Sequence, residues 1–396
     1  MERPRGHRGG AGRRRGWVRV QLRCCCLGVV LALAAPAAAQ QRPWRVAFDG
    51  LVYTDTDNVQ AYTPSLSVRR ALDADGSRVG ASAAVDVVSA ASVDVVSHAT
   101  PRFLEARTQG QLDGVAALGD QQLSLAYRFS WEPDYLSNGL TAGWRSRLGT
   151  PDSVLDVTYG LTWDVVGRSG SSWSVFSEEL FTHSAALSLT QNLGPETILR
   201  VVYGLTAQHG YMEKPYRYVP LFPASVDEAS ITSAQFDRQR SPQRPPESVP
   251  DTRVGHALGG RLVQYLEPID GSLRLDYQIY LDDWSVMSHL VDVRVLGTVS
   301  RGLRFGGYAR GYFQTGASFW QRTYRAEPGE IPLWRSLDRD LSTYGSVTGG
   351  LRVEWEWQDL SGYVDGAAMV THWEDFLLLS DRLAILGQVG LRWTPS

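Results

Sequence analysis

The sequence predicts an all-β protein, namely a transmembrane, antiparallel, up-and-down β-barrel of about sixteen strands, with about twelve or fourteen as alternatives. Three observations predict this fold. Apolar and polar residues alternate with a period of two in many segments. These segments run to about ten residues or more, the length that a tilted strand needs to cross a bilayer. Long and short connections also alternate along the chain. Because lipid cannot satisfy the backbone groups of a sheet edge, such strands must close into a barrel.

The first 39 residues predict a secretory signal peptide. Several arginines precede a short apolar stretch, Leu27 to Ala35, and small residues at 37–39 form a cleavage site before Gln40. The apolar stretch is much shorter than the roughly 20 residues of a transmembrane helix, so an uncleaved anchor is the less favoured alternative. We therefore expect export through a cleaved signal peptide to the outer membrane of a Gram-negative bacterium, with residues 40–396 forming a single barrel.

The chain that follows this leader is acidic and contains no cysteine. All three cysteines, Cys24, Cys25 and Cys26, lie in the leader. Residues 1–39 also hold eight arginines and one acid, which leaves 31 basic and 41 acidic residues and a formal net charge of −10. Disulfides and thiol metal sites are therefore not expected, and the negative charge argues against nucleic acid as a partner. The chain has no phosphate loop, haem-attachment motif or nucleotide fingerprint, so no cofactor is expected.

The alternation defines the individual strands. Leu123, Leu125 and Tyr127 alternate with polar or small residues, and the same pattern returns at 351–358. A soluble exported sandwich is the alternative, but its strands are usually only about five or six residues long. We expect strands near 44–54, 60–72, 79–89, 102–112, 121–131, 139–149, 153–165, 180–192, 197–208, 253–266, 271–281, 284–299, 302–314, 342–357, 361–371 and 382–394. Trp393 is expected to serve as the aromatic residue with which barrels of this class commonly finish.

The connections predict the topology. If the first strand starts in the periplasm, the long connections at 90–101, 166–179, 209–252, 315–341 and 372–381 all lie on the outer side. The intervening turns are short and polar, which is the asymmetry typical of outer-membrane barrels. The longest connection, 209–252, is rich in Pro, Ser, Arg and Gln from 222 onward and has no period, so we expect a long, mobile outer loop.

Several motifs resemble an uncharacterised bacterial family, domain-of-unknown-function family 3570, whose members are thought to be outer-membrane barrels. The motifs are VDVVSAASVDVVSHAT at 85–100, WEPDY at 131–135, Gly210-Tyr211 followed by PYR at 215–217, YLDDW at 280–284, and RGYFQ at 310–314 leading to Ala317. Their order along most of the chain adds weight to each short motif. The resemblance implies a fold and a location but no activity.

Charged residues on the polar faces of the later strands are candidates for the barrel lumen. An arginine that faces lipid at the midplane would cost about 2 to 4 kcal/mol, so the lumen is the favoured side. One interpretation is a charged constriction that selects solutes by sign. The other, which interleaved signs favour, is a lattice of ion pairs that fills or braces the interior. The candidates are Arg274, Asp276, Asp292, Arg294, Arg304, Arg310, Arg352, Glu354 and Glu356.

Two aromatic and acidic clusters are expected at the outer rim, namely Asp134 with Tyr135, and Asp282 and Asp283 with Trp284. Their carboxylates could hold a divalent cation. We favour a simpler interpretation, in which the aspartates make tight turns and the aromatic residues belong to the interfacial girdle. No metal site is therefore assigned.

The beginning of the long outer loop is a third candidate region. Tyr211, Tyr216 and Arg217, together with Lys214, Pro215 and Tyr218, could bind a ligand or simply fold in as the base of the loop. Neither interpretation is preferred from the sequence.

Catalysis has little support. Barrel hydrolases need a Ser nucleophile beside a His base, and His183-Ser184 and Ser288-His289 are the formal candidates. Adjacent residues on a strand point to opposite faces, so neither pair can act through simple adjacency. We therefore expect no enzyme activity and assign no catalytic residue.

Three functional hypotheses follow. The first is a porin-like passive conduit for small polar solutes, narrowed or plugged by the loop at 209–252. The second is a closed barrel that acts as a binding or assembly scaffold for a periplasmic or surface partner, whose identity the sequence does not give. The third, less favoured, is an outer-membrane lipid hydrolase. In every case the expected partners are outer-membrane lipid and, during biogenesis, the barrel-assembly machinery.

Overall fold

The computed structural model describes residues 44–90, 103–326 and 329–395. The predicted signal peptide at 1–39 and the connection 91–102, which contains His98, lie outside the described residues. Among the described residues, no helix has both the length and the apolarity to cross a membrane.

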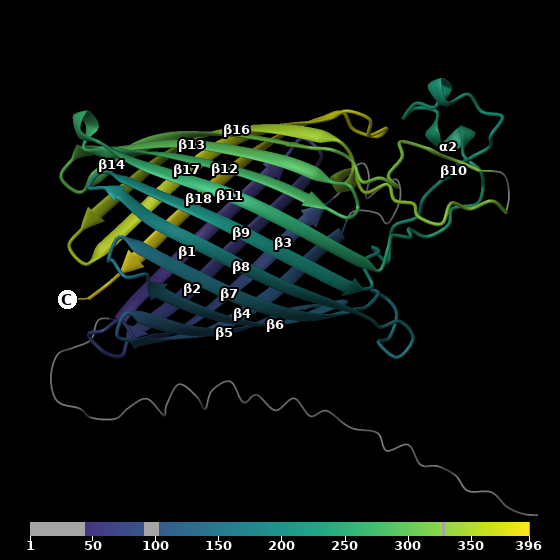
Figure 1. Ribbon diagram of the computed structural model, residues 1–396. Helices are drawn as coiled ribbons and strands as arrows, with labels where there is room; N and C mark the ends of the chain where they lie inside the picture. Colours follow the sequence, from purple (N-terminus) through teal and green to yellow (C-terminus); the bar gives the residue numbers. More distant parts are fainter. Residues whose placement is uncertain (1–43, 91–102, 327–328, 396) are drawn as a thin grey trace, which may run out of the picture. The chain divides into compact units, whose positions relative to one another are not determined.

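Sixteen strands form one closed barrel in which each strand pairs with its neighbours in the chain (Figure 1). All pairs are antiparallel, and the first strand closes on the last, with Val46 opposite Trp393. This confirms the predicted fold class and strand number. The strands are β1 (Trp44–Asp55), β2 (Val59–Ala71), β3 (Arg78–Ala90), β4 (Phe103–Leu118), β5 (Gln121–Glu132), β6 (Tyr135–Arg147), β7 (Ser153–Val166), β8 (Glu178–Gly194), β9 (Thr197–Gly210), β11 (Thr252–Leu266), β12 (Gly271–Asp282), β13 (Met287–Ser300), β14 (Leu303–Gln314), β16 (Tyr344–Trp357), β17 (Leu360–Trp373) and β18 (Asp381–Trp393).

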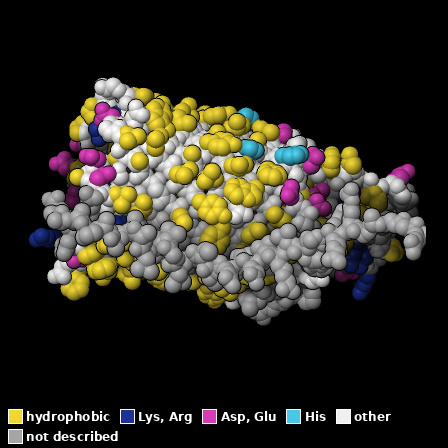
Figure 2. Space-filling model, turned by 90° about the horizontal axis from the view of Figure 1, so that it is seen from below, with side chains coloured by type: hydrophobic (Ala, Val, Ile, Leu, Met, Phe, Trp, Pro, Cys, Tyr) yellow, Lys and Arg dark blue, Asp and Glu magenta, His cyan; other side chains and the backbone are white. Residues whose placement is uncertain are grey.

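The outer wall of the barrel is apolar. On β5, Leu123, Leu125 and Tyr127 are exposed, and Figure 2 shows similar side chains spread over the visible wall, with charged groups gathered toward the two ends. A water-soluble chain rarely exposes so large a contiguous apolar surface. The wall is instead suited to lipid, which needs no hydrogen bonds from side chains and leaves the backbone to pair within the barrel.

The two ends of the barrel differ in their connections. At one end, which we call the turn end, the connections are short: 72–77, 119–120, 148–152, 195–196, 267–270, 301–302 and 358–359. The connection 267–270 contains the short helix η2 (Glu267–Ile269). At the other end, which we call the loop end, they include 167–177, 211–251, 315–343 and 374–380. This is the predicted asymmetry.

Two strands begin three or four residues from the start that the alternation suggested, and the others begin within two residues of it. β6 begins at Tyr135 instead of 139, because Pro133 and Asp134 alone make the turn from β5. β13 begins at Met287 instead of 284. There the Asp282 carboxylate accepts hydrogen bonds from the backbone N–H groups of Trp284 and Val286, at 3.0 and 2.9 Å. Hydrogen bonds of this kind close tight turns and are not visible as a hydrophobic period.

The connections 211–251 and 315–343 fold together, and we call this unit the cap. β10 (Leu221–Phe222) and β15 (Tyr324–Arg325) pair in parallel inside it. Three short helices complete it: η1 (Glu228–Ser230), α2 (Phe236–Gln239) and η3 (Arg339–Leu341). Figure 1 shows β10 and α2 beyond the loop end of the barrel.

The cap has apolar cores of its own. One consists of Val219, Leu221, Tyr324 and Leu337, and another of Phe222, Ile231 and Phe236 with Leu377 and Leu378 from the connection 374–380. The structure therefore differs from our expectation of an aperiodic loop at 209–252. The packing depends on contacts with a segment about a hundred residues later, which no local pattern reveals.

Candidate functional site

The candidate site is the inner face of the barrel. Inward side chains alternate along each strand with the exposed apolar ones, and they converge because this face is concave. The Tyr308 hydroxyl on β14 donates to Asp365 on β17 at 2.8 Å, across the intervening strand β16. Asp292 on β13 is only 1% exposed, between two arginines.

The charges of β11 to β14 are arranged as shared ion pairs. Asp292 accepts hydrogen bonds from Arg294 at 2.6 Å and from Arg310 at 2.9 Å. One strand away, Asp276 lies between Arg261 and Arg274, at 2.5 and 2.6 Å. Each carboxylate therefore neutralises part of the charge of two guanidinium groups.

The pattern continues on β14, β16 and β17. Glu354 lies 3.2 Å from Arg304 and 2.7 Å from Arg352. Arg304 also reaches Glu356 at 3.2 Å, and Arg352 lies 3.7 Å from Asp365. The structure thus brings the predicted lumen charges together as interleaved pairs, not as segregated patches of one sign. We call them the lumen lattice.

Tyrosines extend the lattice. The guanidinium of Arg294 lies 4.7 Å from the ring centre of Tyr308, and that of Arg352 lies 3.9 Å from the ring centre of Tyr363. The Tyr363 hydroxyl then donates to Asp49 on β1 at 2.9 Å. Stacking and hydrogen bonding together hold the arginines against the wall.

The lattice does not bury its arginines. The side chains of Arg261, Arg304 and Arg310 remain 43%, 45% and 43% exposed although they point into a closed barrel. Such exposure requires open space in the lumen. Partly solvated pairs of this kind stabilise a protein by only about 0 to 1 kcal/mol each.

A second part of the inner wall is built from small residues. Thr158, Gly160, Ser184, Gly204 and others of β6 to β12 line a hollow of about 310 Å³. This feature was not predicted, because it depends on the size of the inward side chains and not on their charge. The signal was present, since small residues recur at alternate positions of β6 to β9.

The basic residues on the inner face of the earlier strands were not predicted either. Arg145 of β6 pairs with Asp156 of β7, and Arg200 of β9 lies nearby, donating to the Ser188 hydroxyl of β8. Arg145, Asp156, Ser188 and Arg200 all occupy inward positions of the period-two alternation. The alternation that predicted the later lumen charges therefore also predicts these.

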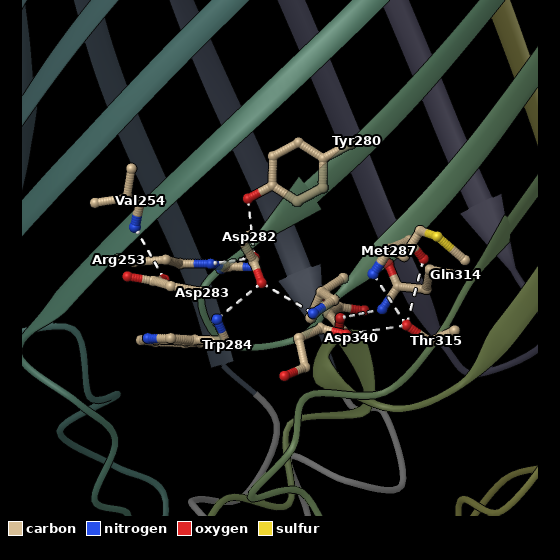
Figure 3. A network of polar contacts seen from close by, with 12 residues as sticks. Arg253, Val254, Tyr280, Asp282, Asp283, Trp284, Met287, Gln314, Thr315 and Asp340 are labelled. Carbon is tan, nitrogen blue, oxygen red and sulfur yellow. Dashed lines mark hydrogen bonds and ion pairs between the residues drawn. The ribbon is translucent and has the colours of Figure 1, made fainter.

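At the loop end, Asp282 is the centre of a polar network (Figure 3). Its side chain is fully buried and accepts hydrogen bonds from Arg253, at 2.5 Å to Nη2, and from the Tyr280 hydroxyl, at 2.9 Å. The neighbouring Asp283 accepts from the backbone N–H of Val254 at 3.0 Å. Asp282 therefore closes the turn, as in the interpretation we favoured, whereas Asp283 binds the neighbouring strand β11.

Trp284 does not belong to an interfacial girdle. It is 6% exposed and packs under the cap, with the Phe319 ring centre at 5.2 Å and the Arg253 guanidinium at 4.6 Å. Its indole N–H donates to the Thr252 carbonyl at 2.9 Å. The girdle prediction was wrong here because the cap, whose fold the sequence did not reveal, covers this part of the rim.

Asp134 lies in a group of three carboxylates. Its oxygens and those of Glu105 and Glu132 come within 4.8 Å of one another. Arg107 lies 3.7 Å from Glu132, and the Tyr216 hydroxyl of the cap donates to Asp134. These contacts compensate part of the negative charge, so the group functions structurally as an anchor for the cap.

Tyr135 also lies away from the predicted girdle. Its hydroxyl donates to Asp164 of β7 at 2.8 Å, and the side chain points inward with the polar face of β6. The alternation places it there because β6 begins four residues earlier than the sequence suggested.

The residues at the beginning of the long loop fold in as the base of the cap. The Tyr211 ring packs edge-on against Phe176 at 5.8 Å, and burial raises the pKa of Tyr211 to about 12. Burial and the hydrogen bond to Asp134 likewise raise the pKa of Tyr216 to about 12. Arg217 lies 2.5 Å from Asp338 and 3.3 Å from Glu247. The Tyr216 hydroxyl and the Arg217 guanidinium are engaged within the chain, and the Tyr211 ring is packed, which favours the structural interpretation.

The hydrolase candidates are separated by the barrel wall. His183 and His289 lie on the outer face, where they form hydrogen bonds with Tyr159 at 2.7 Å and Tyr277 at 2.8 Å. Ser184 lies on the inner face and donates to the Gly160 carbonyl, at 3.5 Å. Neighbouring residues of one strand therefore do not form a nucleophile and base pair.

Comparison with solved structures gives low similarity over nearly the whole chain. A bacterial polysaccharide outer membrane secretin matches with a TM-score of 0.48 and 7% identity, covering 90% of this chain and 99% of that chain. CdiB from Acinetobacter baumannii matches with 0.48 and 9%, covering 89% and 61%. A loop L8 deletion mutant of OmpT, an outer membrane protein of Vibrio cholerae, matches with 0.40 and 8%, covering 89% and 98%. We draw no functional argument from these similarities.

No curated protein matches the sequence. A family model described as "Protein of unknown function (DUF3570)" matches residues 34–364, which is most of the chain and agrees with the resemblance of its motifs. The chain belongs to the DUF3570 family.

Proposed function

We propose that this protein is a porin-like passive conduit for small polar solutes in the bacterial outer membrane. One observation carries the proposal: Arg261, Arg304 and Arg310 of the inner wall remain more than two-fifths exposed inside a closed barrel. A filled barrel would bury these side chains against one another. The hollow of about 310 Å³ along the small-residue wall gives further space on the inner surface.

The chemistry of the wall suits polar solutes. Interleaved charges keep the net field of the lattice low, while hydroxyl, guanidinium and carboxylate groups can replace water around a passing solute. A path with such a wall would exclude apolar compounds and discriminate only weakly by sign. The exception is the wall near Arg200, where positive charge is in excess.

The test is single-channel recording from the folded full-length chain in a planar bilayer. A steady open current is expected, and the same protein denatured by boiling serves as the control. A correctly folded barrel that stays silent at both polarities would rule out the conduit. Fractionation of native membranes, with the gel shift on boiling that closed barrels give, would test the proposed location.

A closed scaffold is the second candidate, because the cap touches several connections at the loop end. Arg339 of the cap lies 2.6 Å from Asp57 between β1 and β2, and Arg168 between β7 and β8 donates to Tyr218 of the cap at 2.7 Å. If the cap closes the barrel, the same recording gives no current, while a tagged cap captures a surface partner from intact cells.

A further inference from the structure

The inner wall carries an uncompensated positive charge at Arg200 of β9. Arg200 pairs in the sheet register with Arg261 of β11 on one side and with Thr190 of β8 on the other. Like charges directly opposite each other on neighbouring strands are destabilising. A stable sheet therefore needs negative charge near each of these arginines to compensate the repulsion.

Other arginines of the wall show the same juxtaposition but have their own acids. Arg274 and Arg294 are also opposite each other, and Asp276 and Asp292 lie 2.6 Å from them. Arg261 has Asp276 at 2.5 Å. The juxtaposition is compensated in each of these cases.

Arg200 lacks such a carboxylate among the residues that the structure describes. Its Nε and Nη2 groups donate to the Ser188 hydroxyl oxygen at 3.2 and 3.1 Å. Ser188 is 3% exposed and in turn donates to Asp156 at 3.3 Å, but Asp156 already pairs with Arg145. A neutral hydroxyl thus fixes one edge of the Arg200 guanidinium, and its remaining N–H groups are left to donate elsewhere.

Arg200 lines a hollow of about 280 Å³ in the wall. Arg78, Arg145 and Arg200 line it together with a single carboxylate, Asp156. The Arg78 guanidinium donates to the Gly76 carbonyl at 3.4 Å. Three guanidinium groups against one carboxylate leave a formal charge of +2 around the hollow. It adjoins the small-residue hollow, with which it shares Thr158 and Ala186.

We propose that this hollow binds the oxyanion group, a phosphate or a carboxylate, of a small solute, with Arg200 as the principal ligand. A guanidinium presents paired N–H donors that match such oxygens, and Arg78 and Arg145 supply further positive charge. This inference gives the class of solute for the proposed conduit and rests on that proposed function for its biological role. Binding itself can be measured without conduction.

The test is titration of the detergent-folded full-length chain with inorganic phosphate by calorimetry. Arg200→Gln should weaken binding by at least about tenfold, because a charge-assisted hydrogen bond is lost. Arg147→Gln is the matched control: Arg147 lies on the same wall, 3.1 Å from Asp120, but does not line the hollow. It should leave the affinity unchanged. Both variants must show the gel shift on boiling.

Two further titrations sharpen the result. Succinate replaces phosphate in the first, and the tighter of the two ligands identifies the oxyanion. Chloride replaces both in the second and should bind far more weakly, since it cannot engage paired donors. Equal affinity of the parent chain and Arg200→Gln for phosphate, or equal affinity for chloride and phosphate, would overturn the site. If the barrel binds phosphate but gives no current in bilayers, the conduit proposal is wrong and the binding site stands. If it gives an open current but binds no phosphate, the binding site is wrong and the conduit stands.

Discussion

Single residues of the lumen lattice have unequal importance, and Asp292 is the most enclosed of them. Its carboxylate is 1% exposed and is the shared partner of Arg294 and Arg310. Glu356 also pairs with an arginine, Arg304, but is 66% exposed. The energetic effect of an ion pair depends on how far water screens it, so these two acids should respond differently to substitution.

Asp292→Asn should destabilise the folded barrel by about 2 to 3 kcal/mol, because it leaves two guanidinium groups without their shared charge. The same change adds one positive charge to the lumen and should shift the reversal potential in a salt gradient toward anions. Urea unfolding in liposomes and bilayer recording measure the two effects. Glu356→Gln is the control and should cost less than about 1 kcal/mol. Equal destabilisation by both variants would contradict this ranking.

The sequence predicted which lattice residues face inward, because alternation fixes the side of each strand residue. It did not predict that Asp292 serves two arginines, since that depends on the register between β13 and β14. It also misplaced Trp284, which follows β12 in a turn where alternation no longer applies. Residue roles were therefore predictable inside the strands and not at their ends.

At the scale of elements, the strands were predictable and the cap was not. Strands such as β7 and β9 show alternation over their whole length, and their ends are marked by Gly, Pro, Asp or Asn. The cap depends on the contact of β10 with β15, Leu221 opposite Tyr324. No local period reveals a contact between two-residue strands so far apart in the chain.

The cap is held to its own base by ion pairs of Asp338, and this predicts an effect of acid. Asp338 lies 2.5 Å from Arg217 and 2.9 Å from Lys214, the only lysine of the chain. Burial alone would raise the pKa of Asp338, but the charges of Arg217 and Lys214 outweigh it and hold that pKa well below its usual range. The ionised form of Asp338 is therefore favoured more strongly in the folded cap than in the unfolded chain.

The sign of the pH dependence follows from this depressed pKa. The stabilisation by Asp338 is fully present above its ordinary pKa of about 4 and is lost as the pH falls below that value. Hydrogen exchange of the amides at 335–342, corrected for intrinsic rates, should show protection that is constant near neutral pH and declines below about pH 4.

Asp338→Asn should remove this acid dependence and weaken the cap at pH 7 by about 3 kcal/mol, since it breaks a buried pair. Asp340→Asn is the control. Burial and the charge of Asp338 raise the pKa of Asp340, so its protonation does not weaken the folded cap, and the decline below pH 4 should stay in place. An unchanged acid dependence in Asp338→Asn would assign the effect to another group.

At the scale of the whole molecule, the contacts of the cap are distributed around the mouth of the barrel. Its segments are rooted in β9, β11, β14 and β16, and it touches the connections after β1, β5, β7, β12 and β17. In the closed strand order these positions lie on all sides. A unit anchored in this way is tied to many connections of the rim and does not hang from one edge, so we expect solutes that enter from the loop end to pass it.

Release of one anchor should therefore change the current through the barrel. Asp57→Asn removes the ion pair between Asp57 and Arg339 of the cap, whose nearly buried side chains lie 2.6 Å apart. The barrel strands and the chain length stay the same. We expect more frequent transitions between conductance levels in single-channel records.

Replacing 215–246 by a short Gly-Ser linker removes most of the first cap segment and should raise the conductance itself. The control is Asp120→Asn at the turn end, which breaks an exposed pair with Arg147 and should leave the records unchanged. If the parent chain conducts and neither cap variant alters its current, solutes reach the lumen without passing the cap. If the parent is silent and the linker variant conducts, the cap is the closure, and the lumen behind it is open.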